Sequence, residues 1–143
     1  MKIKIKRFDK SIPLPAYKTE GAACLDLYSR TEVKIPPHTV GYIPLNIALS
    51  IPKGYWVMIA ARGSTHKMGI MPVHGIGIGD WDYRGDNDEY LFPALNFTDK
   101  EVVIEKGTRM AQMMISKVEK VEMTEVDKLE DKDRGGFGST GRR

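Results

Sequence analysis

The sequence predicts an all-β fold, a jelly roll or distorted β-barrel, formed by a chain of 143 residues. Short stretches in which every second residue is apolar recur along the chain, as in half-buried strands. Pro and Gly separate these stretches at the places where turns are needed. No segment keeps helical periodicity for more than about two turns. Many short strands joined by Pro/Gly turns are typical of barrels and jelly rolls.

Each expected element follows from its local pattern. Apolar alternation or a short apolar run marks four stretches as strands, and Pro or Gly marks the turns. Residues 64–68 suit one short helix, because Ser64 is a preferred N-cap residue. The last strand is expected to end at Ile115. The expected strands are residues 2–6, 32–35, 55–60 and 101–104, and the turns are residues 13–15, 36–37, 52–54 and 106–107.

The C-terminal part differs in composition from the rest. Residues 119–133 are mostly charged, and residues 134–143 hold four glycines, two hydroxyl side chains and three arginines. We therefore expect a β-domain over residues 1–118 and a flexible C-terminal arm over residues 119–143. Backbone N–H groups and Arg side chains suit phosphate oxygens, and Phe137 offers a flat face to a base. Taken alone, the same tail also suits a solvated terminus.

Charge and cysteine content exclude several classes of protein. The net charge of +3 is too small for a general nucleic-acid binder, and no apolar run is long enough to span a membrane. Lysines interrupt the N-terminal apolar residues, so residues 1–6 do not form a signal peptide. Cys24 is alone, which excludes an intrachain disulfide and a cysteine zinc site, and we expect a cytoplasmic protein.

Five segments carry the chemistry, and together they resemble the five motifs of the trimeric dUTPases over nearly the whole chain. The resemblance implies a homotrimer that hydrolyses dUTP to dUMP and pyrophosphate with Mg²⁺. This activity keeps uracil out of DNA and supplies dUMP for dTMP synthesis. The resemblance also implies that each active site contains residues from three subunits. The segments are residues 22–29, 61–65, 77–85 and 106–112, and the tail from Arg134.

Asp80 is the candidate catalytic residue. It lies in a Gly-flanked loop, and a carboxylate there can take a proton from a water molecule, which contributes about 10²–10⁴-fold in rate. The resemblance implies that this water attacks the α-phosphorus. An Asp beside Gly more often supports a turn, but Asp82 fits that role better.

Base and sugar recognition are assigned to the same region. The resemblance implies that the Tyr83 ring leaves no room for a 2′-hydroxyl. The glycines of residues 75–79 do not follow the dinucleotide-binding spacing, and no helix follows them. We expect instead a β-hairpin whose backbone contacts uracil, with His74, Gly75 and Gly77 as contacts.

The resemblance implies phosphate contacts at four places along the chain. Asp26 is expected to support a metal ion only through water, or alternatively to support the turn around it. The metal itself would be held mainly by phosphate and water oxygens. The expected contacts are Arg62, Gly63, Ser64, Gln112 and Arg134, with Phe137, Gly138 and Ser139 closing over the nucleotide.

Several positions depart from the family pattern. Cys24 stands where Gly is usual, Gly63 where Ser is usual, and His74 where Asn is common. Gly79 replaces an Ile or Val and is expected to loosen the loop before Asp80. The tail has two residues between Arg134 and Phe137, where the longer common form has four. The insertion at residues 86–89 resembles dUTPases of Gram-positive bacteria and their phages.

Two other functions compete with dUTP hydrolysis. The related dCTP deaminases carry a catalytic Glu three residues before an Asn, and here Pro93 stands three residues before Asn96. A dUTPase-like regulatory protein that acts by binding a protein partner remains an alternative, as for a phage-derived chain.

Overall fold

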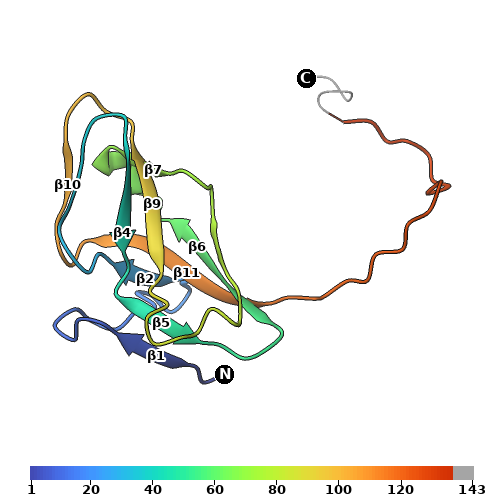
Figure 1. Ribbon diagram of the computed structural model, residues 1–143, viewed down its shortest axis with the longest axis horizontal. Coiled ribbons are helices and arrows are strands. Elements are labelled where there is room, and N and C mark those ends of the chain that lie inside the picture. Colours follow the sequence, from blue (N-terminus) through green and yellow to red (C-terminus); the bar gives the residue numbers. More distant parts are fainter. Residues whose placement is uncertain (137–143) are drawn as a thin grey trace.

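The computed structural model of the chain describes residues 1–136 (Figure 1). Those residues form eleven strands and one 3₁₀ helix, so the predicted all-β class is confirmed. The elements are β1 (Lys4–Arg7), β2 (Leu25–Tyr28), β3 (Val33–Ile35), β4 (Val40–Pro44), β5 (Ile47–Ser50), β6 (Tyr55–Ala61), η1 (Thr65–Met68), β7 (Ile70–Pro72), β8 (Gly77–Gly79), β9 (Leu91–Asn96), β10 (Val102–Ile104) and β11 (Arg109–Lys117).

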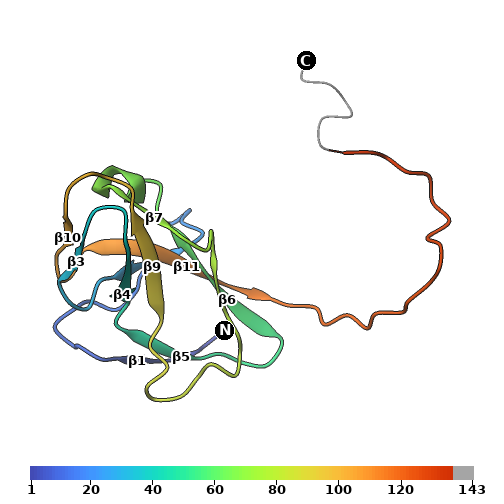
Figure 2. The same ribbon diagram turned by 45° about the horizontal axis from the view of Figure 1, so that its top comes forward.

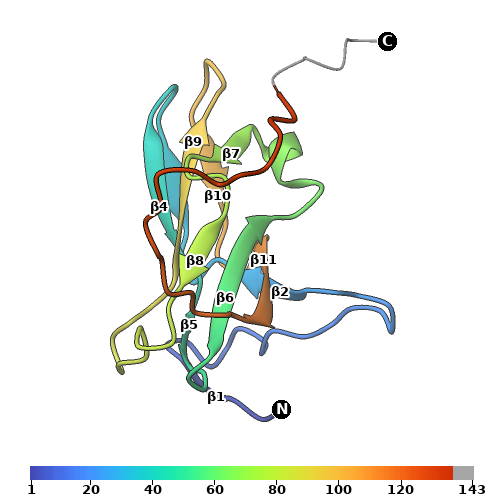
Figure 3. The same ribbon diagram turned by 90° about the vertical axis from the view of Figure 1, so that its right-hand side faces the viewer.

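Antiparallel pairs between strands far apart in the sequence build the barrel. The largest sheet has the order β2-β11-β6-β8 and the next has the order β4-β9-β7 (Figure 3). Two further pairs, β1-β5 and β3-β10, complete the wall. Because of this non-consecutive strand order, motifs from the two halves of the chain lie in the same sheet.

The core lies between the sheets and follows the two-residue period of the strands. On β9 the side chains of Phe92, Ala94 and Asn96 are fully buried, and the alternate side chains face outward. The buried side chain of Asn96 has hydrogen-bond partners, because its amide donates to the carbonyl oxygens of Ile35 and Lys100, at 2.9 and 2.7 Å.

The expected elements are largely present, with small shifts at their ends. The first strand begins at Lys4, and the last continues to Lys117 instead of ending at Ile115. The predicted short helix is present as η1. Its N-cap residue Ser64 makes no side-chain capping bond. Instead, the Thr65 hydroxyl accepts from the Arg62 N–H and donates to the Met110 carbonyl.

The expected hairpin over residues 75–79 is wrong. β7 pairs with β9 in one sheet and β8 pairs with β6 in the other, so residues 73–76 are a connection between two sheets. The connection turns at Gly75, whose φ is +71°. Such a φ favours Gly.

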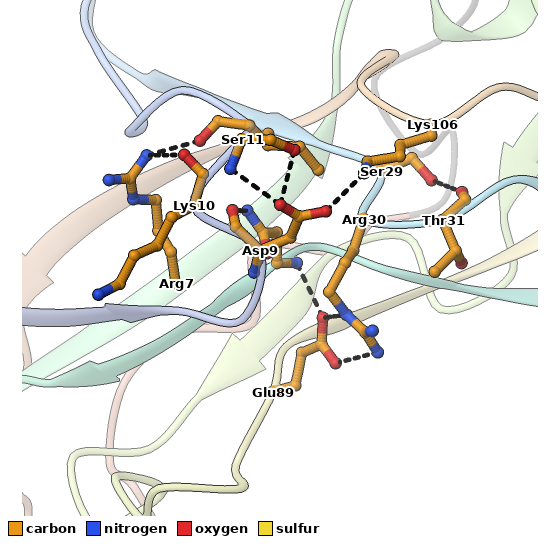
Figure 4. Close-up of polar contacts among 11 residues, drawn as sticks. Arg7, Asp9, Lys10, Ser11, Ser29, Arg30, Thr31, Glu89 and Lys106 are labelled. Carbon is orange, nitrogen blue, oxygen red and sulfur yellow. Dashed lines mark hydrogen bonds and ion pairs between the residues drawn. The ribbon is translucent and has the colours of Figure 1, made fainter.

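A polar cluster ties the N-terminal segment to the turn between β10 and β11 (Figure 4). Asp9 accepts from the Lys106 ammonium at 2.6 Å and from the backbone N–H and hydroxyl of Ser11 at 2.8 and 2.6 Å. These donors, Lys106 first, hold the pKa of the Asp9 carboxyl well below its usual range.

We expect this carboxylate to stabilise the fold only above acidic pH. Its pKa is lowered on folding, so its contribution is complete above the unfolded value of about 4 and falls as the pH drops below that. The Asp9→Asn variant should therefore melt at a lower temperature than the parent at pH 7, and the difference should shrink below about pH 4. Melting curves of both proteins from pH 3 to 8 test this. A difference that does not change with pH would contradict it.

The barrel ends close to residue 118, where the Val118 N–H donates to the Gly54 carbonyl at 3.0 Å. Residues 119–136 contain no helix or strand, and they leave the barrel as an extended segment (Figures 1 and 2). Within residues 1–136, no helix is long and apolar enough to cross a membrane.

Candidate active site

Asp80 lies directly after β8, at the start of a loop that continues to the beginning of β9. Its backbone is held at both ends, since Gly79 pairs with Val57 of β6 and the Asp80 carbonyl accepts from the Tyr83 N–H at 3.2 Å. The side chain is exposed. A fixed backbone with a free carboxylate suits a group that must meet a water molecule and a substrate.

Tyr83 follows in the same loop and is fixed at its hydroxyl. That hydroxyl donates to the Glu89 carbonyl at 3.0 Å, and the ring lies edge-to-face on Tyr90 at 5.3 Å between centroids. Partial burial, with the nearby Asp88 and Glu89 charges, raises the pKa of Tyr83, so the phenol is neutral at physiological pH. The residue is still 40% exposed, so a ligand can contact it.

An apolar pocket of about 260 Å³ lies beside this loop. The His74 ring packs edge-on against Phe92, and Gly77 faces His74 and Ile59 so closely that an added Cβ would lie 3.3 Å from each. Glycine at residue 77 lets the His74 and Ile59 side chains lie close to the backbone. The lining residues are Tyr42, Ile59, His74, Gly77, Ile78, Tyr90, Leu91 and Pro93.

A second, polar pocket of about 590 Å³ gathers other predicted residues at the far end of β6. Arg62 donates from Nε to Asp26 Oδ1 at 2.9 Å, and Arg109 donates from Nη1 to Asp26 Oδ2 at 3.2 Å. Gln112 donates to the Ala61 carbonyl at 2.9 Å. The pocket is lined by Lys18, Ala22, Ala23, Cys24, Asp26, Arg62, Gly63, Ser64, Arg109 and Gln112.

The charge of this pocket suits an anion. It holds three cationic side chains, Lys18, Arg62 and Arg109, and one carboxylate, Asp26, whose two oxygens are engaged by the arginines. Asp26 therefore orients Arg62 and Arg109. Lys18 and Arg109 are additions to the predicted set. Arg109 lies inside a quoted motif, whereas nothing in the sequence marked Lys18.

Metal ligands are scarce in the described part of the chain. Among residues 1–136 no three His, Cys, Asp or Glu side chains are grouped so that they could hold a metal ion. A cation here would need most of its oxygen ligands from a bound phosphate group and water, as Mg²⁺ commonly does.

The departures from the family pattern have different structural contexts. A Cβ at Gly63 would meet no atom within 4 Å, so a side chain fits and the glycine is not a steric requirement. Cys24 is a free thiol in the wall of the polar pocket. Gly79 leaves no gap, because the Tyr90 ring fills the adjacent space; the expected loosening of the loop has no support in this packing.

The two pockets do not meet within one chain. Gly79 pairs with Val57 near the start of β6, whereas Arg62 follows the end of that strand. About 17 Å of extended backbone separates these two points. Asp80 and Arg62 of one chain thus lie at opposite ends of β6, and the two pockets have no lining residue in common.

The tail residues are only partly described. Arg134 is exposed. The predicted contacts Phe137, Gly138 and Ser139 lie outside the described residues.

Comparison with known proteins gives one consistent result. The family profile described as dUTPase matches residues 10–141. A "Deoxyuridine 5'-triphosphate nucleotidohydrolase" of Dictyoglomus turgidum is 36% identical and covers 99% of each chain. A solved dUTPase variant of Staphylococcus bacteriophage 80alpha with dUpNHpp covers 98% of each chain, with a TM-score of 0.84 at 22% identity. A dUTPase variant from phage phi11 of S. aureus, described with a structural Mg(II) ion, has a TM-score of 0.78 at 18% identity, covering 92% of this chain and 100% of that chain.

Proposed function

The chain belongs to the dUTPase family, and from that premise we propose that it hydrolyses dUTP to dUMP and pyrophosphate. The observation that carries the proposal is that the two pockets have different chemical character. One is apolar and adjoins a cavity that holds Asp80 and Tyr83 and shares Ile78, Tyr90 and Leu91 with it. The other is cationic and suits phosphates. In the cell this reaction would keep uracil out of DNA and supply dUMP for dTMP synthesis.

In the proposed reaction Asp80 acts as the general base. Its carboxylate takes a proton from a water molecule while the water oxygen forms a bond to the α-phosphorus. The bond from the α-phosphorus to the bridging oxygen breaks, and pyrophosphate leaves with that oxygen. The free carboxylate on a fixed backbone supports this role.

Binding of the triphosphate is assigned to the polar pocket. Arg62 and Gln112 contact phosphate oxygens, with backbone N–H groups of Gly63 and Ser64 as further donors. Mg²⁺ bound to the phosphates would neutralise charge as the pyrophosphate leaves. Asp26 contributes by orienting Arg62, and it reaches the metal at most through water.

Base and sugar selection are assigned to the apolar pocket. Backbone groups around Gly75 and Gly77 pair with the uracil edge beside His74, and the tight wall leaves no space for the methyl group of thymine. The exposed face of Tyr83 packs under the sugar, where a 2′-hydroxyl would collide with the ring.

We infer that the active enzyme is a homotrimer in which the apolar pocket of one chain and the polar pocket of another serve one nucleotide, because the two pockets of a single chain are separate and share no lining residue. The outer face of the β4-β9-β7 sheet supports assembly. Val40, Tyr42, Met71 and Leu91 are large apolar side chains exposed on it, and Tyr42 is 65% exposed. An exposed apolar patch is typical of a protein interface or a ligand site, and Tyr42 and Leu91 also line the apolar pocket, so the interface would adjoin that pocket. The tail, with Arg134 and Phe137, would then close over the nucleotide.

Deamination of dCTP is the less suitable activity for this chain. Pro93 occupies the place of the expected catalytic Glu, and it has neither an acid nor an N–H to offer. Asn96 is fully occupied by backbone carbonyls and Thr98.

A product assay tests the proposal. The purified chain with Mg²⁺ should convert dUTP to equal amounts of dUMP and pyrophosphate, with UTP and dCTP much poorer substrates. Chromatography of the nucleotides and a pyrophosphate assay measure both products. Release of orthophosphate, or of ammonia from dCTP, would contradict the proposal.

A further inference from the structure

Tyr90 is the most unusual buried side chain near the site. It is 5% exposed, and its hydroxyl is the one buried side-chain N or O atom among residues 1–136 that has no hydrogen-bond partner. Burial raises the pKa of Tyr90 to about 12, so the hydroxyl stays neutral. A buried hydroxyl without a partner destabilises a fold, so the ring that carries it must be held by its packing.

The Tyr90 ring occupies the space beside Gly79. A Cβ added at Gly79 would lie 2.6 Å from both Cε1 and the hydroxyl oxygen of Tyr90, and 3.0 Å from Cζ. These distances are so short that any side chain at residue 79 would require the Tyr90 ring to move. Gly79 is not among the glycines with positive φ, so the backbone there does not require glycine. Residue 79 is glycine because the Tyr90 ring occupies the space that a side chain would need.

The same ring also contacts Tyr83. The two rings meet edge-to-face with 76° between their planes, a favoured geometry for aromatic pairs. Tyr83 is thus fixed at two points, its ring by the Tyr90 side chain and its hydroxyl by the Glu89 carbonyl.

Glu89 and Tyr90 are themselves anchored to the barrel. The Glu89 carboxylate accepts from Arg30 at 2.8 and 2.9 Å and from the Asn46 N–H at 2.9 Å (Figure 4). The Tyr90 N–H donates to Ile47, and its carbonyl accepts from Leu45 at 2.9 Å. Two residues with fixed backbones therefore support Tyr83, which lies in a loop without strand bonds of its own.

We propose that Tyr90 is a positioning residue for sugar selection, and that Gly79 stands before Asp80 to admit the Tyr90 ring. This inference rests on the proposed role of Tyr83 in excluding the 2′-hydroxyl. A shift of the Tyr83 ring by a fraction of an ångström opens the space where that hydroxyl is rejected. The ring of Tyr90, not its hydroxyl, sets this distance.

The test is the ratio of kcat/KM for dUTP to kcat/KM for UTP. In Tyr90→Leu, which removes the ring but keeps the site apolar, the ratio should fall at least about tenfold. Tyr90 also lines the apolar pocket, so the rate with dUTP can fall as well; dUTP and UTP carry the same base, so a change in base binding alone would leave the ratio unchanged. Tyr90→Phe is the matched control: it keeps the ring, so the ratio should be retained and the melting temperature should stay the same or rise.

A steric pair of variants gives an independent readout. Gly79→Ala should lower the ratio in the parent, because the new methyl group displaces the Tyr90 ring. In the Tyr90→Leu background the same change should have a much smaller effect, since the space is then free. Melting temperature and sedimentation of every variant show whether it is folded and assembled, and additive effects of the two changes would overturn the proposal.

Two reference measurements separate this inference from the proposed function. If the parent does not hydrolyse dUTP or does not discriminate against UTP, or if Tyr83→Ala leaves the ratio unchanged, the proposed function is wrong. If the parent discriminates, Tyr83→Ala lowers the ratio and Tyr90→Leu does not, the positioning role is wrong. Loss of selectivity in Tyr90→Phe would also overturn it, because the hydroxyl would then be the acting group.

Discussion

We expect the Asp80→Asn variant to bind dUTP as the parent does and to hydrolyse it about 10²–10⁴-fold more slowly. The amide has the shape of the carboxylate but cannot accept the proton of the attacking water. The Asp80 side chain is exposed, and its backbone is held by Val57 and Tyr83, so the fold should not change.

Single-turnover rates and the affinity for a non-hydrolysable dUTP analogue separate chemistry from binding. Asp82→Asn is the matched control, because it removes the same charge two residues away in the same loop. It should retain most of the rate. A parent-like rate in Asp80→Asn would show that another group activates the water.

The second large effect is expected from a charge placed in the polar pocket. Gln112→Glu replaces the side-chain NH₂ group by an oxygen and so puts a carboxylate where the triphosphate should bind. Two like charges about 4 Å apart repel by roughly 4 kcal/mol at an effective dielectric constant of 20, and this exposed pocket is screened further. We therefore expect kcat/KM to fall on the order of 100-fold, mostly through a higher KM.

The loss should shrink when the ionic strength is raised, because salt screens the repulsion. Gln112→Met serves as the uncharged control and should lose far less, since it removes one donor without adding charge. An unchanged KM in Gln112→Glu would place the phosphates elsewhere.

The sequence predicts those parts of this fold and site that depend on local chemistry. Period-two alternation and the turns at Pro and Gly define most strands, because each of these signals acts within a few residues. The resemblance in motif order identified Arg62 and Gln112 as pocket residues, and the structure brings both to one pocket. The catalytic role of Asp80 and the roles of Phe137, Gly138 and Ser139 stay predictions.

What the sequence does not predict depends on which strands pair. The glycines of residues 75–79 suggest a hairpin, but pairing of β8 with β6 and of β7 with β9 is decided by packing across the barrel. Lys18 reaches the polar pocket from a distant loop, and Tyr90 fills the space beside Gly79 only because β9 starts there. Such contacts join residues that have no common local pattern.

The central claim is that one active site combines the apolar pocket of one chain with the polar pocket of another. Mixed oligomers test it most directly. Asp80→Asn damages only the loop beside the apolar pocket and Gln112→Glu only the polar pocket, so at dUTP concentrations below KM each variant alone is nearly inactive. Co-expression in equal amounts gives sites in which both pockets are intact, at about one site in four if assembly is random.

The account predicts that the mixed oligomers recover about a quarter of the parent rate, whereas a mixture of Asp80→Asn with Asp80→Ala, which both lack the same group, recovers none. If mixtures of Asp80→Asn with Gln112→Glu stayed as inactive as the separate variants while assembling normally, each site would belong to a single chain, and the account would be contradicted.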